Sequence, residues 1–415
     1  MRPLKMLWPA LCVTLLTLCW LGDGAALAVD YSEFYYGPDS EVHVMGDVLA
    51  SSEFSLTGER IDVVFSDIEE TGDVEKYAVL LEDDPDIAEL QSAAVRLTGA
   101  TLSFDTSGGN EDDNVAVAMW GFDESLISLS EGSVLSVDIA SYMGYGIEVL
   151  GYFNATPTTA ILLDGGSTIE ISGSADDPLT FPDSTSSRFA YGLYIPTLGG
   201  DVSLTLDHGS AINVETSAYP AEEDSSYASS YAARLEGDVV NVALDHESTI
   251  SALATRNSDS DGFTNANART LVLVSLSNSM ISVEGNSLIN AQAIVENGVA
   301  FAYVLQTYGS GASEFLLSDS TFSATATADG YADALGAYFS QPEVRATLTR
   351  STIDVDAISS SYGARASGFV GQSNSDVRLD MEGATIDVLA QTQGDFANAT
   401  GVMIIGATNL DIDIA

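Results

Sequence analysis

The sequence has few residues that could cross-link the chain covalently. Cysteine occurs only twice in 415 residues, at Cys12 and Cys19, and both lie in an apolar segment near the amino terminus. Removing that segment leaves no thiol, which excludes disulfides and thiolate chemistry from the rest of the chain. The fold therefore has to be stable without covalent cross-links.

Basic residues are also scarce. Lys and Arg total 13 against 61 Asp and Glu, which gives a formal net charge of −48 at pH 7. A surface this acidic repels nucleic acid and anionic lipid, so neither is expected as a partner. Halophilic adaptation and loose binding of divalent cations both account for the charge, and the composition does not separate them. The chain also lacks a Pro-rich or low-complexity linker, which favours one elongated domain over several.

The amino terminus has the pattern of a secretory signal. Arg2 and Lys5 precede an apolar run over residues 6–21, and Ala26-Leu27-Ala28 is a small-residue cleavage signature. A membrane anchor is the alternative, but the run is shorter than the roughly 20 residues of a bilayer span and contains Pro9. We predict a signal peptide over 1–28, an aromatic-rich amino-terminal cap over 29–46, and a repeat domain over 47–415 that does not span a membrane.

The repeat domain is organised around an apolar anchor that follows a polar turn. The anchors recur at an average interval of about 36 residues, within the range of stacked repeat units. The residue after each anchor is polar and the next is apolar, the alternation of a half-buried strand. The ten anchors are Ile61, Leu102, Leu135, Ile169, Ile212, Ile250, Ile289, Phe322, Ile353 and Ile386.

Two further strands complete each repeat. A strand before each turn ends in an apolar residue: Leu56, Leu97, Leu129, Leu163, Leu206, Leu244, Val283, Leu317, Leu348 and Met381. A third apolar stretch lies between each anchor and the next such strand. The chain runs through the three strands in the same direction in every repeat. Each strand is therefore expected to pair in parallel with the equivalent strand of the next coil. We therefore predict an all-β fold, a right-handed parallel β-helix of three-strand coils with about ten repeats. Helical repeats would need apolar positions at i, i+3, i+4 and i+7, and leucine-rich repeats would need an Asn ladder that is missing.

Few residues are candidates for chemistry. The histidines are His43, His208 and His246, and the last two follow Asp207 and Asp245 at equivalent places in consecutive coils. The fold predicts an Asp–Asp and a His–His stack there, which could hold a metal. We interpret it instead as an ordinary side-chain ladder in which each Asp and its neighbouring His point apart.

Acidic motifs are the other candidates. A polysaccharide lyase or glycosidase needs clustered Asp pairs for acid–base work, or Ca²⁺-binding carboxylates beside a basic residue. No basic residue lies close in sequence to the adjacent acidic pairs, which are Asp83-Asp84, Asp112-Asp113 and Asp176-Asp177. Residues 259–262 (DSDG) resemble the start of a Ca²⁺ loop but lack its closing Glu. We therefore predict no catalytic, cofactor-binding or metal-binding residues, and no enzyme activity.

The coils resemble a known family. The amino-terminal signal, the lack of cysteine after it, turns of the L-x-x-x-S-T-[IL]-x-V type and A-x-G middle strands are similar to the passenger regions of bacterial autotransporters of the pertactin-like kind, over about residues 50–415. The resemblance implies a protein exported to the bacterial cell surface, the outer membrane or the medium. Autotransporters end in a membrane β-barrel that this sequence lacks, so the resemblance also implies that the chain is a fragment.

Function is then expected in the corner loops, because inserted loops of a solenoid gather on one face. The acid-rich loops 175–189 and 219–231 are the leading candidates, with a host or matrix surface protein or a glycan as partner. A β-helical carbohydrate-active enzyme and a purely structural surface-layer spacer are the alternatives.

Overall fold

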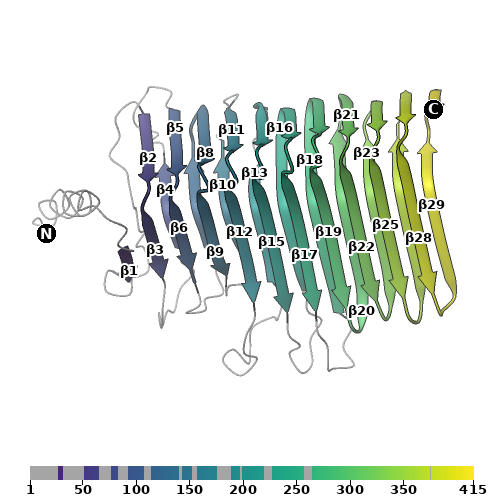
Figure 1. The fold of residues 1–415 in the computed structure, drawn as a ribbon, viewed down its shortest axis with the longest axis horizontal. Helices are drawn as coiled ribbons and strands as arrows, with labels where there is room; N and C mark the ends of the chain where they lie inside the picture. The colour runs from purple at the N-terminus through teal and green to yellow at the C-terminus, as the bar shows by residue number, and fades with distance from the viewer. Residues whose placement is uncertain are drawn as a thin grey trace, which may run out of the picture.

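The chain forms a parallel β-helix. The computed structural model describes residues 27–30, 51–64, 76–82, 92–106, 114–139, 143–151, 157–174, 188–196, 199–218, 227–256, 264–373 and 375–415. These residues contain thirty strands and no helix. Successive coils lie side by side in sequence order along one axis (Figure 1). Every strand pairing between coils is parallel, as the repeat predicts. Within the described ranges, no helix is long and apolar enough to cross a membrane.

One side of the β-helix, sheet A, is formed by the strands that carry the anchors. Its eleven strands pair in chain order. They are β1 (Leu27–Asp30), β3 (Arg60–Val64), β6 (Thr101–Asp105), β9 (Val134–Ile139), β12 (Thr168–Ser174), β15 (Ala211–Ala218), β17 (Thr249–Arg256), β19 (Leu288–Val295), β22 (Thr321–Ala328), β25 (Thr352–Ser359) and β28 (Thr385–Thr392).

The other nineteen strands form one continuous sheet with two ladders. The pre-turn ladder contains β2 (Ser51–Thr57), β5 (Ser92–Thr98), β8 (Glu124–Ser130), β11 (Thr158–Leu163), β14 (Val202–Leu206), β21 (Ala312–Ser318), β24 (Glu343–Thr349), β27 (Asp376–Glu382) and β30 (Asn409–Ile414). The middle ladder contains β4 (Lys76–Glu82), β7 (Asn114–Trp120), β10 (Met143–Leu150), β13 (Arg188–Pro196), β20 (Gly298–Gly309), β23 (Tyr331–Ser340), β26 (Gly363–Gln372) and β29 (Phe396–Ile405). Two long strands, β16 (Tyr227–Leu244) and β18 (Thr264–Val283), belong to both ladders.

These long strands correct one detail of the sequence analysis, which expected three separate strands in every coil. In two coils the chain passes from the middle to the pre-turn ladder without leaving β structure. The pairing of β16 with β18 shifts register between Gly237 and Val239, so an irregularity within the strand makes the corner.

The predicted anchors are in register throughout sheet A. Ile61 pairs with Leu102, and the series continues rung by rung to Ile353 opposite Ile386. The ten residues predicted to end the pre-turn strands are also in register, from Leu56 to Met381. The repeat alignment is therefore confirmed at the level of single residues.

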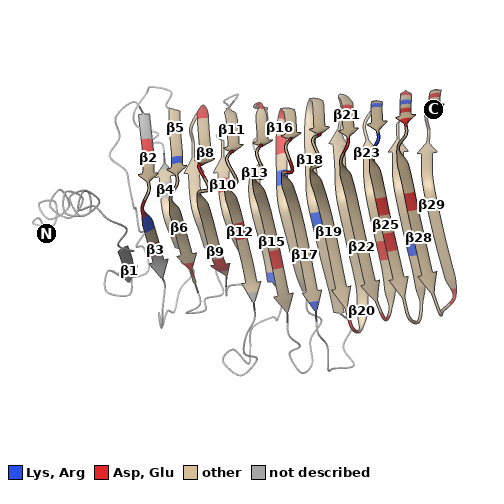
Figure 2. Ribbon diagram, in the orientation of Figure 1, with Lys and Arg blue, Asp and Glu red and all other residues tan. Residues whose placement is uncertain are grey.

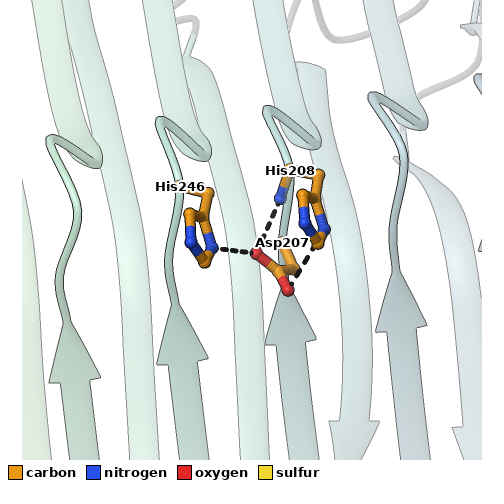
Figure 3. A group of neighbouring side chains, drawn as sticks. All are labelled: Asp207, His208 and His246. Carbon is orange, nitrogen blue, oxygen red and sulfur yellow. Dashed lines mark hydrogen bonds and ion pairs between the residues drawn. The ribbon is translucent and has the colours of Figure 1, made fainter.

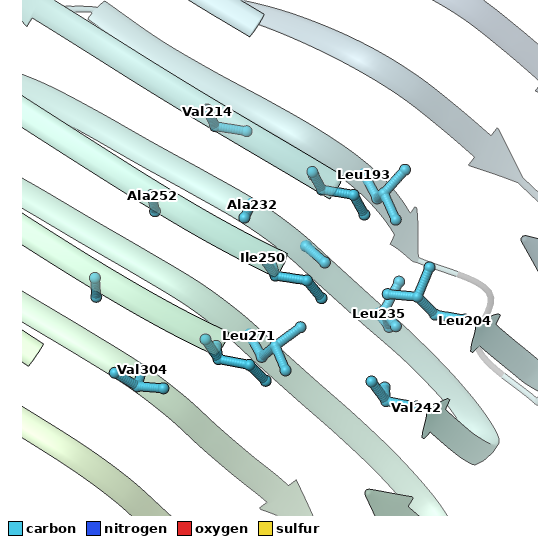
Figure 4. Packing of buried hydrophobic residues seen from close by; sticks show 14 of the residues in the cluster. Leu193, Leu204, Val214, Ala232, Leu235, Val242, Ile250, Ala252, Leu271 and Val304 are labelled. Carbon is cyan, nitrogen blue, oxygen red and sulfur yellow. The ribbon is translucent and has the colours of Figure 1, made fainter. Parts of the chain in front are cut away.

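The interior is one continuous column of apolar side chains. Leu204, Leu235 and Ile250 come from the three sides of the coil and are fully buried (Figure 4). Burying an aliphatic side chain contributes about 1.5–3 kcal/mol relative to leaving it exposed, and this gain offsets the entropy lost by ordering the chain. The column explains how the fold can be stable without covalent cross-links, because each rung packs against the rungs on either side.

Small residues occupy the point where the middle strand bends into the core. A Cβ on Gly192 would lie 2.3 Å from the carbonyl oxygen of Ala232 and 3.1 Å from Cγ2 of Ile212. A Cβ on Gly336 would lie 2.5 Å from the carbonyl oxygen of Gly368. The A-x-G pattern of the middle strands therefore reflects the narrowness of the coil at this bend.

The predicted domain boundaries fall mostly outside the described residues. The apolar run of the signal peptide and residues 31–46 of the cap are not described. Strand β1 crosses the predicted cleavage point after Ala28 and pairs with β3, Leu27 opposite Ile61. The signal peptide and the cap stay predictions.

Candidate functional sites

Two clusters of side chains on the outside of the β-helix stand out. The first, the Asp–His ladder, consists of Asp164, Asp207, His208, Asp245 and His246. It lies at the turns that connect the pre-turn ladder to sheet A, where β11, β14 and β16 end in successive coils. Parallel pairing therefore places residues far apart in sequence directly beside one another.

The backbone at these turns sets the direction of the imidazole rings. His208 and His246 have φ of 52° and 50°, in the left-handed region that non-glycine residues seldom adopt. The backbone N–H groups of His208 and His246 donate to the carboxylates of Asp207 and Asp245, each at 2.8 Å. The hydroxyls of Ser210 and Ser248 donate hydrogen bonds to the backbone carbonyls of Asp207 and Asp245 within the same turns.

The two imidazole rings stack in parallel, with centroids 5.0 Å apart and an interplanar angle of 2° (Figure 3). His246 Nδ1 lies 2.6 Å from Asp207 Oδ1, and His208 Nδ1 lies 3.2 Å from Asp207 Oδ2. His208 Nδ1 also lies 2.8 Å from Asp164 Oδ1, and His246 Nδ1 lies 3.3 Å from Asp245 Oδ2. The carboxylate of Asp207 therefore bridges both rings.

The predicted His–His stack is present, but the expected orientation of its neighbours is wrong. Sequence neighbours in an extended strand point to opposite faces, and this was the reason to expect Asp207 and His208 to point apart. The left-handed residue directly after the strand breaks this alternation and turns the ring back towards the carboxylate.

Hydrogen bonding shifts the acid–base balance of the ladder. The bond to Asp207, reinforced by the nearby charge of Asp245, raises the pKa of His246. Partial desolvation raises the pKa of Asp207, but hydrogen bonds from His246 and from the backbone of His208 outweigh it and lower the pKa of this carboxyl overall. The ladder thus favours a cation between its carboxylates.

The second cluster, the Tyr–Arg face, lies on the side of the middle ladder opposite the main core, where Tyr191 and Tyr231 are half-buried and Tyr145 is buried. Tyr145, Tyr191 and Tyr231 occupy one register position in three successive coils. The ring of Tyr191 stacks on both neighbours, with centroids 5.1 Å and 4.7 Å away and an interplanar angle of 17° in each case. Burial in this stack, followed by the proximity of Tyr231, raises the pKa of Tyr191 to about 12. The Tyr191 phenol therefore stays neutral at physiological pH.

Arginine continues the same row. Arg269 follows Tyr231 in register and is followed by Tyr303. Its guanidinium carbon lies 5.4 Å from the centroid of Tyr231 and 5.7 Å from that of Tyr303, within the range of cation–π attraction. One row over, Arg234 lies 5.7 Å from the Tyr194 ring and pairs with Glu236 at 2.6 Å.

The Tyr–Arg face is unusual for this protein because basic residues are few along the β-helix (Figure 2). Arg269 forms a hydrogen bond with Asn267 but no ion pair with a carboxylate in the part of the chain that the structure describes. This face was not among the predicted sites. The signal that could have revealed it was tyrosine at one position of the middle strand in three consecutive repeats.

The remaining candidates lie largely outside the described residues. His43, the pairs Asp83-Asp84, Asp112-Asp113 and Asp176-Asp177, and residues 259–262 are not described. The same holds for residues 175–187 and 219–226, which make up most of the two candidate loops. Those predictions stay untested.

A shallow groove crosses the outer face of the pre-turn ladder near the carboxyl-terminal end. Its lining includes Glu314, Arg345, Arg378 and Asp411, which occupy one register position in successive coils. The row holds two acidic and two basic residues, which neutralise one another, and Arg378 also forms an ion pair with Asp380 at 2.8 Å.

Comparison with known proteins does not assign the chain to a family. No family model, curated protein or solved structure matches the chain. Any functional assignment therefore rests on the β-helix and its surface.

Proposed function

We propose that this chain is an exported β-helical surface protein, of the passenger or adhesin kind, that binds a surface glycan through the Tyr–Arg face. The observation that carries the proposal is the stacked row Tyr145–Tyr191–Tyr231 continued by Arg269. Tyrosine and arginine are the residues that dominate binding energy at interfaces, since they offer large, rigid contact area and directed hydrogen bonds.

The rigidity of the face favours binding. Each tyrosine is held by a neighbour in the next coil, so little side-chain entropy is lost when a partner packs on it. The guanidinium of Arg269 adds positive charge where most of the surface is negative, which favours a glycan that carries carboxylate groups. The acid-rich loops 175–189 and 219–231 would repel such a glycan, so they stay separate candidates for contacts with another partner.

Binding is tested with the mature chain, residues 29–415, on an array of neutral and acidic glycans and on immobilised matrix proteins. We expect saturable binding of an acidic glycan, weakened roughly tenfold or more, about 1.4 kcal/mol, by Tyr191→Ala and by Arg269→Gln. Tyr362→Ala is the matched control, because this tyrosine is 68% exposed on another part of the surface. Binding of a matrix protein alone, or of no probe, would refute the glycan proposal, as would equal affinity of all variants.

Export is tested separately, by expressing the full chain in a Gram-negative host. We expect the exported protein to begin at Val29 by mass spectrometry, and cells to lose it on mild protease treatment. A cytoplasmic product that retains Met1 would contradict export.

We also propose that the protein is not an enzyme. A screen of acidic polysaccharides with and without Ca²⁺ should give no saturable turnover. Turnover by the wild-type chain would overturn this part.

A further inference from the structure

The Asp–His ladder has the donor atoms of a transition-metal site. Within the described residues, Asp207, His208 and His246 form a group whose ligand atoms all lie within 4.8 Å of one another. Imidazole nitrogen combined with carboxylate oxygen suits Zn²⁺ and its neighbours in the first transition row, whereas Ca²⁺ and Mg²⁺ prefer oxygen alone.

The distances between donor atoms support a common ion. Each Nδ1 lies 2.6–3.3 Å from two carboxylate oxygens. Ligands about 2.0–2.1 Å from a tetrahedral Zn²⁺ stand roughly 3.3 Å from one another. Both imidazole side chains are 60% exposed, so rotations of their rings can bring the two Nδ1 atoms to that separation.

The negative charge of the ladder and the fixed conformation of its backbone both favour binding of a cation. The three carboxylates of Asp164, Asp207 and Asp245 lie beside the two imidazoles, so the ladder has an excess of negative groups. The turns are held from below by hydrogen bonds from Ser210 Oγ to the Asp207 carbonyl, 2.7 Å, and from Ser248 Oγ to the Asp245 carbonyl, 2.6 Å. The ligands therefore sit on fixed backbone, which lowers the entropy lost on binding.

We propose that Asp207, His208 and His246 bind one divalent transition ion of the Zn²⁺ class, through both Nδ1 atoms and the bridging carboxylate, with Asp164 and Asp245 beside it. Binding requires an unprotonated Nδ1 on each ring, so a proton carried there is released to solvent or moves to Nε2, and each ring keeps one proton on Nε2. The site joins two adjacent coils at the turn into sheet A. It is independent of the glycan proposal, because the Tyr–Arg face lies on the middle ladder.

The test uses chelator-stripped mature protein, residues 29–415, titrated with ZnCl₂ by calorimetry. We expect one saturable site, and thermal unfolding that shifts upward as Zn²⁺ is added. Substitution of Co²⁺ should give the intense visible absorption of a tetrahedral complex. Excess Ca²⁺ should not compete for this site, because Ca²⁺ prefers oxygen ligands. Loose binding to the acidic surface would instead be shared by both ions, so competition by Ca²⁺ would indicate that kind of binding.

Variants locate the site. His246→Asn and His208→Asn remove an imidazole but keep a residue that tolerates the left-handed conformation, and each should weaken Zn²⁺ binding at least tenfold with an unchanged far-ultraviolet circular dichroism spectrum. Asp354→Asn, which changes a carboxylate ladder on sheet A, is the matched control and should keep wild-type affinity. Failure of Zn²⁺ to saturate one site would overturn the proposal, as would competition by Ca²⁺ or equal affinity of the His and Asp variants.

Discussion

Removing one phenyl ring from the core tests whether the packed column stabilises the β-helix. Phe339 is fully buried, and its ring centroid lies 5.6 Å from that of Phe315 and 5.2 Å from that of Phe369. Phe339→Ala loses the transfer free energy of the ring and leaves a cavity between these two neighbours. Substitutions of this kind cost about 3–5 kcal/mol, a factor of roughly 10² to 10³·⁵ in the unfolding equilibrium.

Unfolding in urea, followed by far-ultraviolet circular dichroism, measures the loss. Phe339→Leu keeps an apolar side chain and should cost less than about 1.5 kcal/mol if the site repacks. Thr347→Ala, at an exposed position of β24, should change stability by about 0.5 kcal/mol or less. The three variants share one region of the chain, so their ranking isolates the contribution of the buried ring.

Hydrogen exchange adds spatial information, since stability in a repeat protein is close to a sum over coils and their interfaces. Amides of β20, β23 and β26 should lose protection in Phe339→Ala, while those of β7 and β10 should keep it. A loss of less than 0.5 kcal/mol would refute the reasoning, as would uniform loss of protection along the chain.

Three further predictions concern other parts of the fold. Gly192→Val should destabilise the protein by about 1–3 kcal/mol through overpacking at the bend, measured by urea unfolding, and a neutral result would show that the coil can widen there. Arg256→Met should stabilise it by about 1–3 kcal/mol, because burial lowers the pKa of Arg256 to about 10 and its three guanidinium nitrogens have no hydrogen-bond partner among the described residues. Destabilisation by Arg256→Met would instead show that a carboxylate pairs with it. Burial, followed by the charges of Asp354 and Asp387, raises the pKa of Asp356 above its unfolded value, so the protonated carboxyl favours folding at low pH and this advantage is lost as pH rises through the folded pKa. Asp356→Asn should therefore raise the melting temperature at pH 7 but have little effect below about pH 4, and a pH-independent difference would contradict the electrostatic cause.

The fold was predictable because its information is local and repeated. Each anchor such as Ile353 follows a polar turn and begins an apolar–polar alternation, and the same signal recurs ten times. A single strand of this length is ambiguous, but a register error would bury polar residues in every coil. The pairing of Asp354 with Asp387 followed from the same alignment and is confirmed.

The candidate sites were harder to predict. The stacking of His208 on His246 followed from the repeat, but the approach of each ring to Asp207 did not, because it depends on a positive φ that histidine seldom adopts. The fusion of strands within β16 and β18 depends on an irregularity near Gly237 that has no counterpart in the repeat pattern.

The sequence by itself determined the class of fold, the residues that fill the core and the rungs that stack, because alternation and period are properties of the chain. Tertiary structure decided which surface residues meet. Tyr191 contacts Tyr145 and Tyr231 because parallel pairing places the three residues in register, although segments of unequal length separate them in sequence. Arg269 gains its two aromatic neighbours in the same way. Loop length varies from coil to coil while strand spacing does not, so the outer faces become defined only when the coils stack.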